Sequence, residues 1–172
     1  EGRILLKLEL EALKKAQAAT DAKAMHTHLA NALIFRSHRQ DTPEKKTAEN
    51  SLEINEGLAE YTGIMLSGRQ EKEMIAHLAN SIDLFYENPT FVRSFAYQTI
   101  PNYGYLLSKQ QKNWQHEISK ETNLTDFLLA TFKLDISSDK TYEQIAQAED
   151  YNYSQIKEVE TVREEKRLAK IA

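Results

Sequence analysis

The scarcity of helix-breaking residues constrains the fold of this chain more than any other feature. Only five glycines and three prolines occur among 172 residues, whereas the helix-favouring residues Leu, Ala, Glu, Lys and Gln are abundant. Hydrophobic residues make up 41% of the sequence, which is enough to build a core in one domain of this size. The sequence therefore predicts an all-α protein, an irregular bundle of about seven to nine helices in a single domain over residues 1–172.

Charge and composition exclude several classes of protein. The net charge is −4, both signs are interspersed, and no basic cluster with interleaved aromatic residues is present, so nucleic acid is not an expected partner. No apolar run approaches the roughly 18 residues that a transmembrane helix requires, so we expect no transmembrane segment. The absence of cysteine excludes disulfides and thiolate metal sites, and it is compatible with either the cytoplasm or an extracytoplasmic compartment.

Helical periodicity and capping residues locate the first three helices. A leucine-rich stripe predicts a largely buried helix over residues 3–19, and Thr20 or Asp21 is expected to cap the next helix. Thr42 followed by Pro43 is a typical helix start, and this third helix is expected to run to about Leu66.

The second half of the chain predicts shorter elements. A fourth helix is expected to end at Asn88 and Pro89, followed by a short helix from Pro89 to Thr99. Pro101 and Gly104 then predict a tight turn before another helix. Ser138 or Asp139 is expected to cap a later helix, and the charged C-terminal tail is expected to lie on the surface.

Four acidic residues recur along one side of the third helix. Because each helical residue turns about 100°, Glu49, Glu53, Glu56 and Glu60 fall within roughly one sixth of its circumference. Such stacking is unfavourable by about 0.2–0.5 kcal/mol for each adjacent pair. Two interpretations remain open: a solvated acidic face, or a cleft in which one or two carboxylates meet a cation.

The remaining residues of this helix predict how it packs. A separate apolar stripe is expected to face the core, namely Ile54, Leu58, Tyr61 and Met65. Gly57 and Ala59, which flank the acidic positions, are small enough to let a second helix approach closely.

The segment "NEGLAEYTG", residues 55–63, resembles the second half of the gluzincin metallopeptidase signature. In that family one helix carries HExxH, which supplies two zinc-binding histidines and a general-base glutamate. A later helix supplies the third ligand from an Asn-Glu-Gly-x-Ala context. The resemblance implies that Glu56 is a zinc ligand and that Glu53 and Glu60 are nearby acids that orient it.

A second stretch supports the same family. "SFAYQTIPNYGYLLSKQ", residues 94–110, resembles a region of these peptidases in which a turn and a helix start bring a tyrosine to the site. The resemblance implies that an oxyanion donor is Tyr97 or Tyr103, and Tyr105 is a weaker candidate. The competing interpretation is that they are ordinary core and turn aromatics.

No HExxH occurs in these 172 residues. The resemblance therefore implies either a longer protein, whose HExxH segment precedes Glu1, or a degenerate homologue that does not bind zinc. The opening "EGRILLKLELEAL", which enters an apolar helix at once, favours the longer protein. On this interpretation zinc belongs to the full-length protein, and this chain binds none alone.

Two functions of different classes follow from these patterns. The first is the C-terminal helical portion of a zinc-dependent hydrolase of peptide or protein substrates, inactive without its HExxH segment. By analogy with that family, a periplasmic or secreted location is expected. The alternative is a non-catalytic helical protein-interaction domain, whose acidic stripe meets a basic surface of a partner protein.

Overall fold

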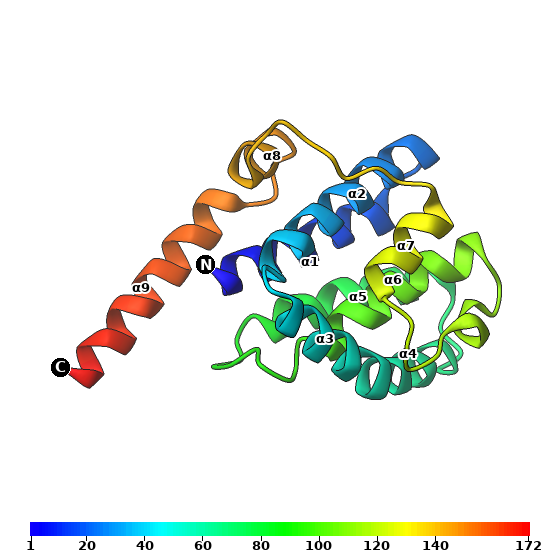
Figure 1. Ribbon diagram of the computed structural model, residues 1–172, viewed down its shortest axis with the longest axis horizontal. Coiled ribbons are helices and arrows are strands. Elements are labelled where there is room, and N and C mark those ends of the chain that lie inside the picture. The colour runs from blue at the N-terminus through cyan, green and yellow to red at the C-terminus, as the bar shows by residue number, and fades with distance from the viewer.

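The structure, a computed structural model, describes residues 1–172 and contains helices but no strands. A π-helical turn (Glu53–Gly57) joins α3 to α4, and a 3-10 turn (Trp114–Glu117) follows α6. This architecture, shown in Figure 1, confirms the predicted all-α bundle. The α-helical segments are α1 (Gly2–Ala18), α2 (Ala22–Arg39), α3 (Pro43–Leu52), α4 (Leu58–Met65), α5 (Glu71–Phe85), α6 (Ala96–Gln110), α7 (Leu124–Phe132), α8 (Tyr142–Ala148) and α9 (Tyr153–Ile171).

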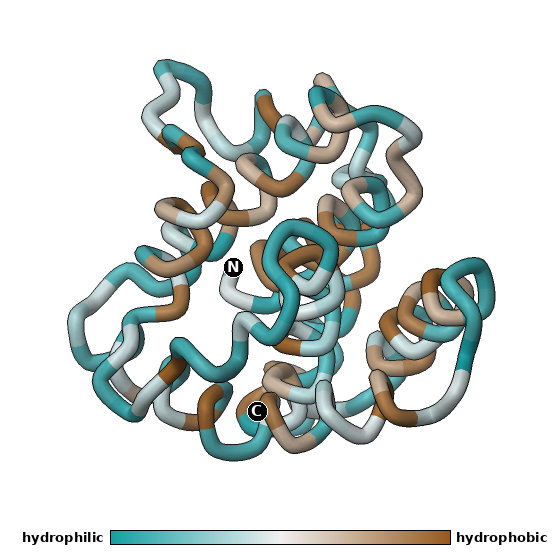
Figure 2. Tube along the Cα trace, turned by 90° about the vertical axis from the view of Figure 1, so that its right-hand side faces the viewer, coloured by the Kyte–Doolittle hydropathy of each residue, from teal (hydrophilic) through white to brown (hydrophobic).

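The centre of the bundle is the helix pair α1 and α2, and α6 packs against α1. The leucines predicted to form the stripe of the first helix are buried, and they belong to one core of 30 buried residues drawn from most of the helices. Hydrophobic positions in Figure 2 accordingly recur along the helices, whereas the connections are mostly hydrophilic. Because a single core connects these elements, the helices around it are held at fixed positions.

The third helix begins as predicted but contains an irregularity. Thr42 caps it by accepting from the backbone N–H of Lys45 at 3.2 Å, and Pro43 occupies its first position. The helix continues to Met65 through the π-helical turn, in which the N–H of Leu58 donates to the carbonyl of Glu53. This wider turn was not predicted, and it changes which residues face the core.

The sequence-based expectation for the region around Pro101 was wrong. No turn interrupts the chain there, because α6 runs continuously from Ala96 to Gln110 with Pro101 inside it. Proline removes one helical hydrogen bond, but Ile100 and Tyr103 beside it are buried in the core, and this packing keeps the segment helical. Gly104 serves close packing instead of a turn: a Cβ atom there would lie 2.6 Å from the ring of Tyr61.

The expected cap of the later helix was also misplaced. Thr141, not Ser138 or Asp139, caps α8, and its side chain accepts from the backbone N–H of Gln144 at 3.2 Å. The Gln144 side chain accepts in return from the N–H of Thr141, which completes a capping box. The reciprocal pair satisfies two free backbone donors, so it determines where the helix starts.

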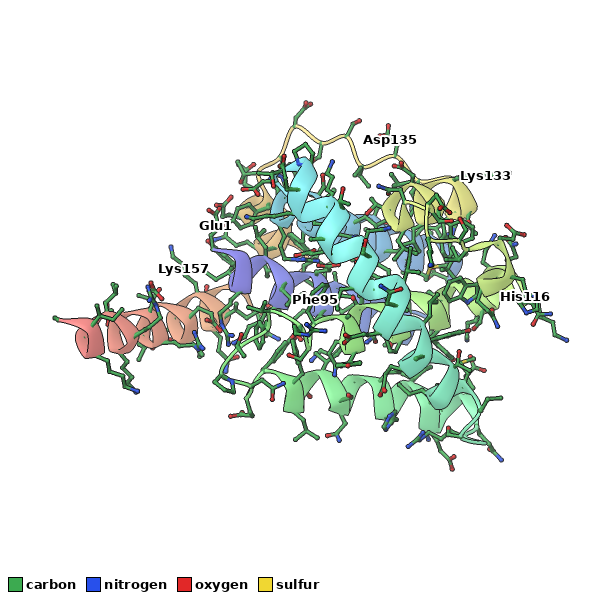
Figure 3. The ribbon with its side chains drawn as sticks, turned by 60° about the horizontal axis from the view of Figure 1, so that its bottom comes forward. Glu1, Phe95, His116, Lys133, Asp135 and Lys157 are labelled. Atoms are coloured by element: carbon green, nitrogen blue, oxygen red, sulfur yellow. The ribbon has the colours of Figure 1, made fainter.

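The C-terminal helix α9 extends away from the bundle, as Figures 1 and 3 show, and lies on the surface as predicted. Its near end is held by buried Ile156 and by Glu160, whose carboxylate binds Arg3 at 2.8 Å and Lys7 at 2.6 Å. No helix in the chain has both the length and the apolar character needed to cross a membrane.

Candidate functional site

The π-helical turn places two acidic side chains in opposite environments. In an α-helix, residues three positions apart lie on the same face. Here Glu53 is fully buried, whereas the side chain of Glu56 is 28% exposed. The extra width of the π-helical turn accounts for this separation, and single π turns within α-helices frequently occur at functional sites.

Glu56 forms a small cluster at the surface with two residues near the start of α6, Arg93 and Tyr97, which we call the surface cluster. One carboxylate oxygen accepts from Arg93 Nη2 at 2.6 Å, and the other accepts from the hydroxyl of Tyr97 at 2.7 Å. The hydrogen bond from Tyr97, followed by that from Arg93, lowers the pKa of Glu56. The same bond to Glu56 raises the pKa of Tyr97, so the pair holds an ionised acid beside a protonated phenol at neutral pH.

Close contact between the π-helical turn and α6 depends on Gly57. A Cβ atom at this position would lie 2.5 Å from Cγ1 of Ile100 and 2.9 Å from the carbonyl oxygen of Ala96. The expectation that Gly57 admits a second helix is therefore confirmed. The same expectation for Ala59 was wrong, because Ala59 is exposed to solvent.

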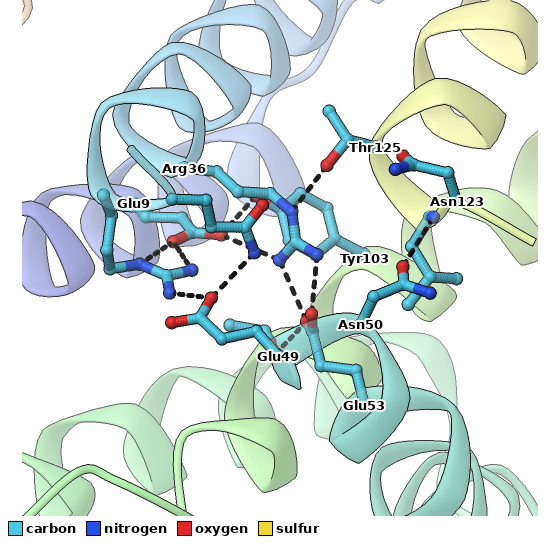
Figure 4. Close-up of polar contacts among 12 residues, drawn as sticks. Glu9, Arg36, Glu49, Asn50, Glu53, Tyr103, Asn123 and Thr125 are labelled. Atoms are coloured by element: carbon cyan, nitrogen blue, oxygen red, sulfur yellow. Dashed lines mark hydrogen bonds and ion pairs between the residues drawn. The ribbon is translucent and has the colours of Figure 1, made fainter. Parts of the chain in front are cut away.

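Behind the surface cluster lies a second group of charges, the buried cluster, formed by Glu9, Arg36, Arg39, Glu53 and Tyr103 (Figure 4). Its hydrogen bonds connect α1, α2, the π-helical turn and α6. All five residues are less than a tenth exposed. Burial of so much charge is tolerable only because each group has partners of opposite charge or hydrogen bonds.

Arg36 and Glu53 form a two-pronged ion pair at one end of the buried cluster. Two guanidinium nitrogens of Arg36 donate to the two carboxylate oxygens of Glu53 at 2.9 and 2.6 Å. The hydroxyl of Thr99 donates to Glu53 at 2.7 Å, and Nε of Arg36 donates to Thr125 at 2.9 Å. Burial lowers the pKa of Arg36, but the carboxylates of Glu53 and Glu9 outweigh it and raise that pKa overall.

Glu9 is the acceptor at the other end of the buried cluster. Its carboxylate accepts from Arg39 at 3.1 and 2.7 Å and from the hydroxyl of Tyr103 at 2.7 Å. Burial, together with the charge of Glu9, raises the pKa of Tyr103 well above its usual value. Arg39 also binds Glu49, which lies partly exposed at the edge of the cluster.

The acidic stripe is thus neutralised largely within the chain. Glu49 pairs with Arg39, Glu53 with Arg36 and Glu56 with Arg93, while Glu60 is exposed to solvent. Of the two interpretations of the acidic stripe, the one in which carboxylates meet a cation holds for three of the four acids. The cations are arginine guanidinium groups of the same chain.

The predicted core face of this helix is confirmed but incomplete. Tyr61 is buried, and Ile54, Leu58 and Met65 are partly buried and pack against the core. The positions that face inward within the π-helical turn are those of Glu53 and Gly57. The reason is the π-helical turn, which shifts the register of every later residue relative to a regular α-helix.

The structure brings together some of the residues that the resemblance singled out. Glu56 and Tyr97 are in contact at the surface, whereas Glu53 and Tyr103 belong to the buried cluster. Tyr105 lies elsewhere, with its hydroxyl 3.4 Å from Glu71. No group of three or more His, Cys, Asp or Glu side chains in the chain could hold a metal ion, whereas a catalytic zinc site takes three protein ligands.

Three members of the buried cluster escaped the sequence-based reasoning: Glu9, Arg36 and Arg39. Glu9 lies between Leu8 and Leu10, within the apolar stripe of a helix in which every residue from Leu5 to Leu13 is buried. A charge in such a position must find a buried partner. That signal is visible in the sequence, but the identity of the partners depends on how the helices pack.

Comparisons with known proteins add nothing to this geometry. No family model, curated protein or solved structure matched the chain. A functional proposal therefore depends on the resemblance of residues 55–63 to the gluzincin signature and on the contacts described above.

Proposed function

We propose that this chain is the helical C-terminal part of a zinc-dependent peptidase, to which it contributes Glu56 as the third zinc ligand. The observation that carries the proposal is the contact between Glu56 and Tyr97. The resemblance selects these two residues from segments 41 positions apart, and their side chains meet at 2.7 Å on the protein surface.

The chemistry of the surface cluster is compatible with this role. A metal ligand must be deprotonated, and the lowered pKa of Glu56 keeps its carboxylate ionised at neutral pH. Arg93 is 74% exposed, so its guanidinium can leave the carboxylate without any buried group losing a partner. Zinc, when bound, would polarise the substrate carbonyl and activate water.

Tyr97 is suited to act as a hydrogen-bond donor beside that ligand. Its pKa is raised by the hydrogen bond to Glu56, so the phenol stays protonated at neutral pH. A protonated phenol next to the metal ligand can donate to the oxyanion that forms when a peptide bond is attacked. The two histidines and the general base would come from outside these 172 residues, and the chain alone should hydrolyse nothing.

The alternative function, a non-catalytic interaction domain, has less support. It requires an acidic stripe free to meet a basic partner, but Glu49, Glu53 and Glu56 already bind arginines of the same chain. Only Glu60 is left as an unshielded acid on that side.

The decisive experiment measures zinc in the protein expressed from its complete gene. We expect zinc in the wild type, its loss in Glu56→Gln, and its retention in Glu44→Gln, which removes an exposed acid in the first turn of the same helix. Metal content is measured by mass spectrometry after exhaustive dialysis. A wild-type protein without zinc, or a Glu56→Gln variant with the wild-type amount, would overturn the proposal.

Tyr97→Phe provides a second test in the same protein. Loss of one oxyanion donor lowers kcat by about 10²–10³-fold in other hydrolases, and we expect a similar decrease toward a peptide substrate with zinc content unchanged. Tyr105→Phe, which alters a hydroxyl far from Glu56, is the matched control. Equal activities of Tyr97→Phe and wild type would remove Tyr97 from the mechanism.

A further inference from the structure

We infer that Thr99 and Arg36, acting through Glu53, are positioning residues for Glu56: their buried contact fixes the π-helical turn against α6 and so aims the surface carboxylate. The functional meaning of this inference rests on the proposed role of Glu56 as a ligand. The geometric claim does not, because it concerns only residues of this chain.

Three contacts follow one another between the π-helical turn and α6. The innermost joins Glu53 to Thr99 at 2.7 Å and is fully buried. The middle contact is the close packing of Gly57 on Ile100. The outermost joins Glu56 to Tyr97 at 2.7 Å and is exposed. The two segments therefore meet along a line that runs from the core to the surface.

The buried end of this line is rigid. Both oxygens of Glu53 are bound by Arg36, and one of them also accepts from Thr99. A two-pronged guanidinium–carboxylate pair fixes the plane of the carboxylate as well as its distance. Arg36 is itself held by Thr125, so the first residue of the π-helical turn is tied to α2, α6 and α7 at once.

The contacts at the exposed end of this line are too weak to fix the Glu56 side chain by themselves. An exposed ion pair such as Glu56–Arg93 is screened by solvent and contributes little. Tyr97 is 40% exposed, so water can compete for its hydroxyl group. The direction of the Glu56 side chain must therefore be set by the backbone of the turn, and the anchors of that turn are Glu53 at its start and Gly57 at its end.

The test observes the surface contact directly, in crystal structures of the protein and its variants. We expect Thr99→Val, which removes the hydroxyl but keeps the shape, to move the Glu56 carboxylate beyond hydrogen-bond distance of the Tyr97 hydroxyl. Thr99→Ser should restore the 2.7 Å contact. Nuclear Overhauser effects between the Glu56 side chain and the Tyr97 ring provide the same measurement in solution, with Tyr97→Phe used to assign the ring signals.

Thr62→Val is the matched control, because the hydroxyl of Thr62 donates only to the carbonyl of Leu58 on the exposed side of α4. It should leave the contact between Glu56 and Tyr97 unchanged. Should Thr99→Val fail to fold, Thr99→Ala removes the same hydroxyl with a smaller side chain. A folded Thr99 variant without the hydroxyl that keeps the wild-type contact between Glu56 and Tyr97 would overturn the inference.

The consequence for the metal is measured separately in the complete protein. Loss of a residue that orients a metal ligand lowers metal affinity by about 10–100-fold, so Thr99→Val should weaken zinc binding to this degree, and Thr99→Ser should restore it. The two proposals can fail independently. Absence of zinc overturns the ligand role of Glu56, whereas an unchanged contact between Glu56 and Tyr97 in the Thr99 variants overturns the positioning role of Thr99.

Discussion

Glu53 and Glu56 are three residues apart in one π-helical turn, and each carboxylate accepts from one guanidinium and one hydroxyl. Glu53 binds Arg36 and Thr99 in the core. Glu56 binds Arg93 and Tyr97 at the surface. The donor sets are chemically alike, so burial is what distinguishes the two sites.

This difference determines what each site can do. In the core, water cannot replace a lost partner, so the contacts of Glu53 are fixed and removing one of them is expensive. At the surface, solvent can replace Arg93, so the carboxylate of Glu56 remains available to another cation. The carboxylate of Glu53 therefore has a structural role, whereas that of Glu56 is available for binding.

The largest effect should come from substituting the two acids. Glu53→Gln leaves the buried charge of Arg36 largely uncompensated, and we expect the free energy of unfolding to fall by about 3–5 kcal/mol. Glu56→Gln, which alters an exposed acid of the same turn, should not change it measurably. Urea denaturation followed by circular dichroism provides the comparison. Equal destabilisation by both substitutions would mean that burial is not the distinguishing factor.

A smaller effect is expected at the glycine between the two sites. Gly57→Ala inserts a methyl group against Ile100 and the backbone of α6, and such overpacking costs about 1–3 kcal/mol. Gly63→Ala, in the same long helix but facing open space, should instead stabilise the protein by about 0.5–1 kcal/mol. Thermal unfolding of both variants checks the opposite signs. A neutral Gly57→Ala would show that α6 can move away without loss.

The two tyrosines extend the comparison to single hydroxyl groups. Tyr103→Phe removes a donor to buried Glu9, and we expect a loss of about 1–2 kcal/mol of unfolding free energy. Tyr97→Phe removes the donor to Glu56 and should leave stability unchanged within error. The measurement is again urea denaturation. A destabilised Tyr97→Phe variant would indicate that the surface cluster contributes to folding.

The smallest effect concerns the pH range over which the surface contact exists. The pKa of Glu56 is lowered and that of Tyr97 is raised, so the hydrogen bond is lost as pH falls through the first value or rises through the second. In Glu56→Gln, the pKa of Tyr97 should decrease toward its ordinary value. NMR titration of the tyrosine ring tests this, and an unchanged pKa would show that the bond is not formed in solution.

The parts of the fold that depend on local sequence were predictable. Thr42 and Pro43 define a helix start through their own backbone preferences, and the structure confirms it. Pro101 shows the limit of such reasoning, because its local preference for a turn is overridden by the burial of its neighbours. Where local preference and tertiary packing disagree, a single sequence does not reveal which prevails.

The candidate site was predictable in a similar, partial way. The resemblance identified Glu56 and Tyr97, which prove to be in contact. The positions of Glu53 and Tyr103 in a buried cluster could not be anticipated, because their partners Glu9, Arg36 and Arg39 come from the first two helices. A pattern on one helix also cannot reveal a π-helical turn, which shifted the register of the acidic stripe.

The way in which α9 is attached has a practical consequence. Its contacts with the bundle are concentrated near Ile156 and Glu160, and every residue from 164 to 172 is exposed. A fluorophore or an affinity label placed on these last two turns would stand well clear of both carboxylate sites. The distal part of α9 is therefore a suitable site for attaching the protein to a surface or for labelling it. We expect such a label to leave the contacts of Glu53 and Glu56 unchanged.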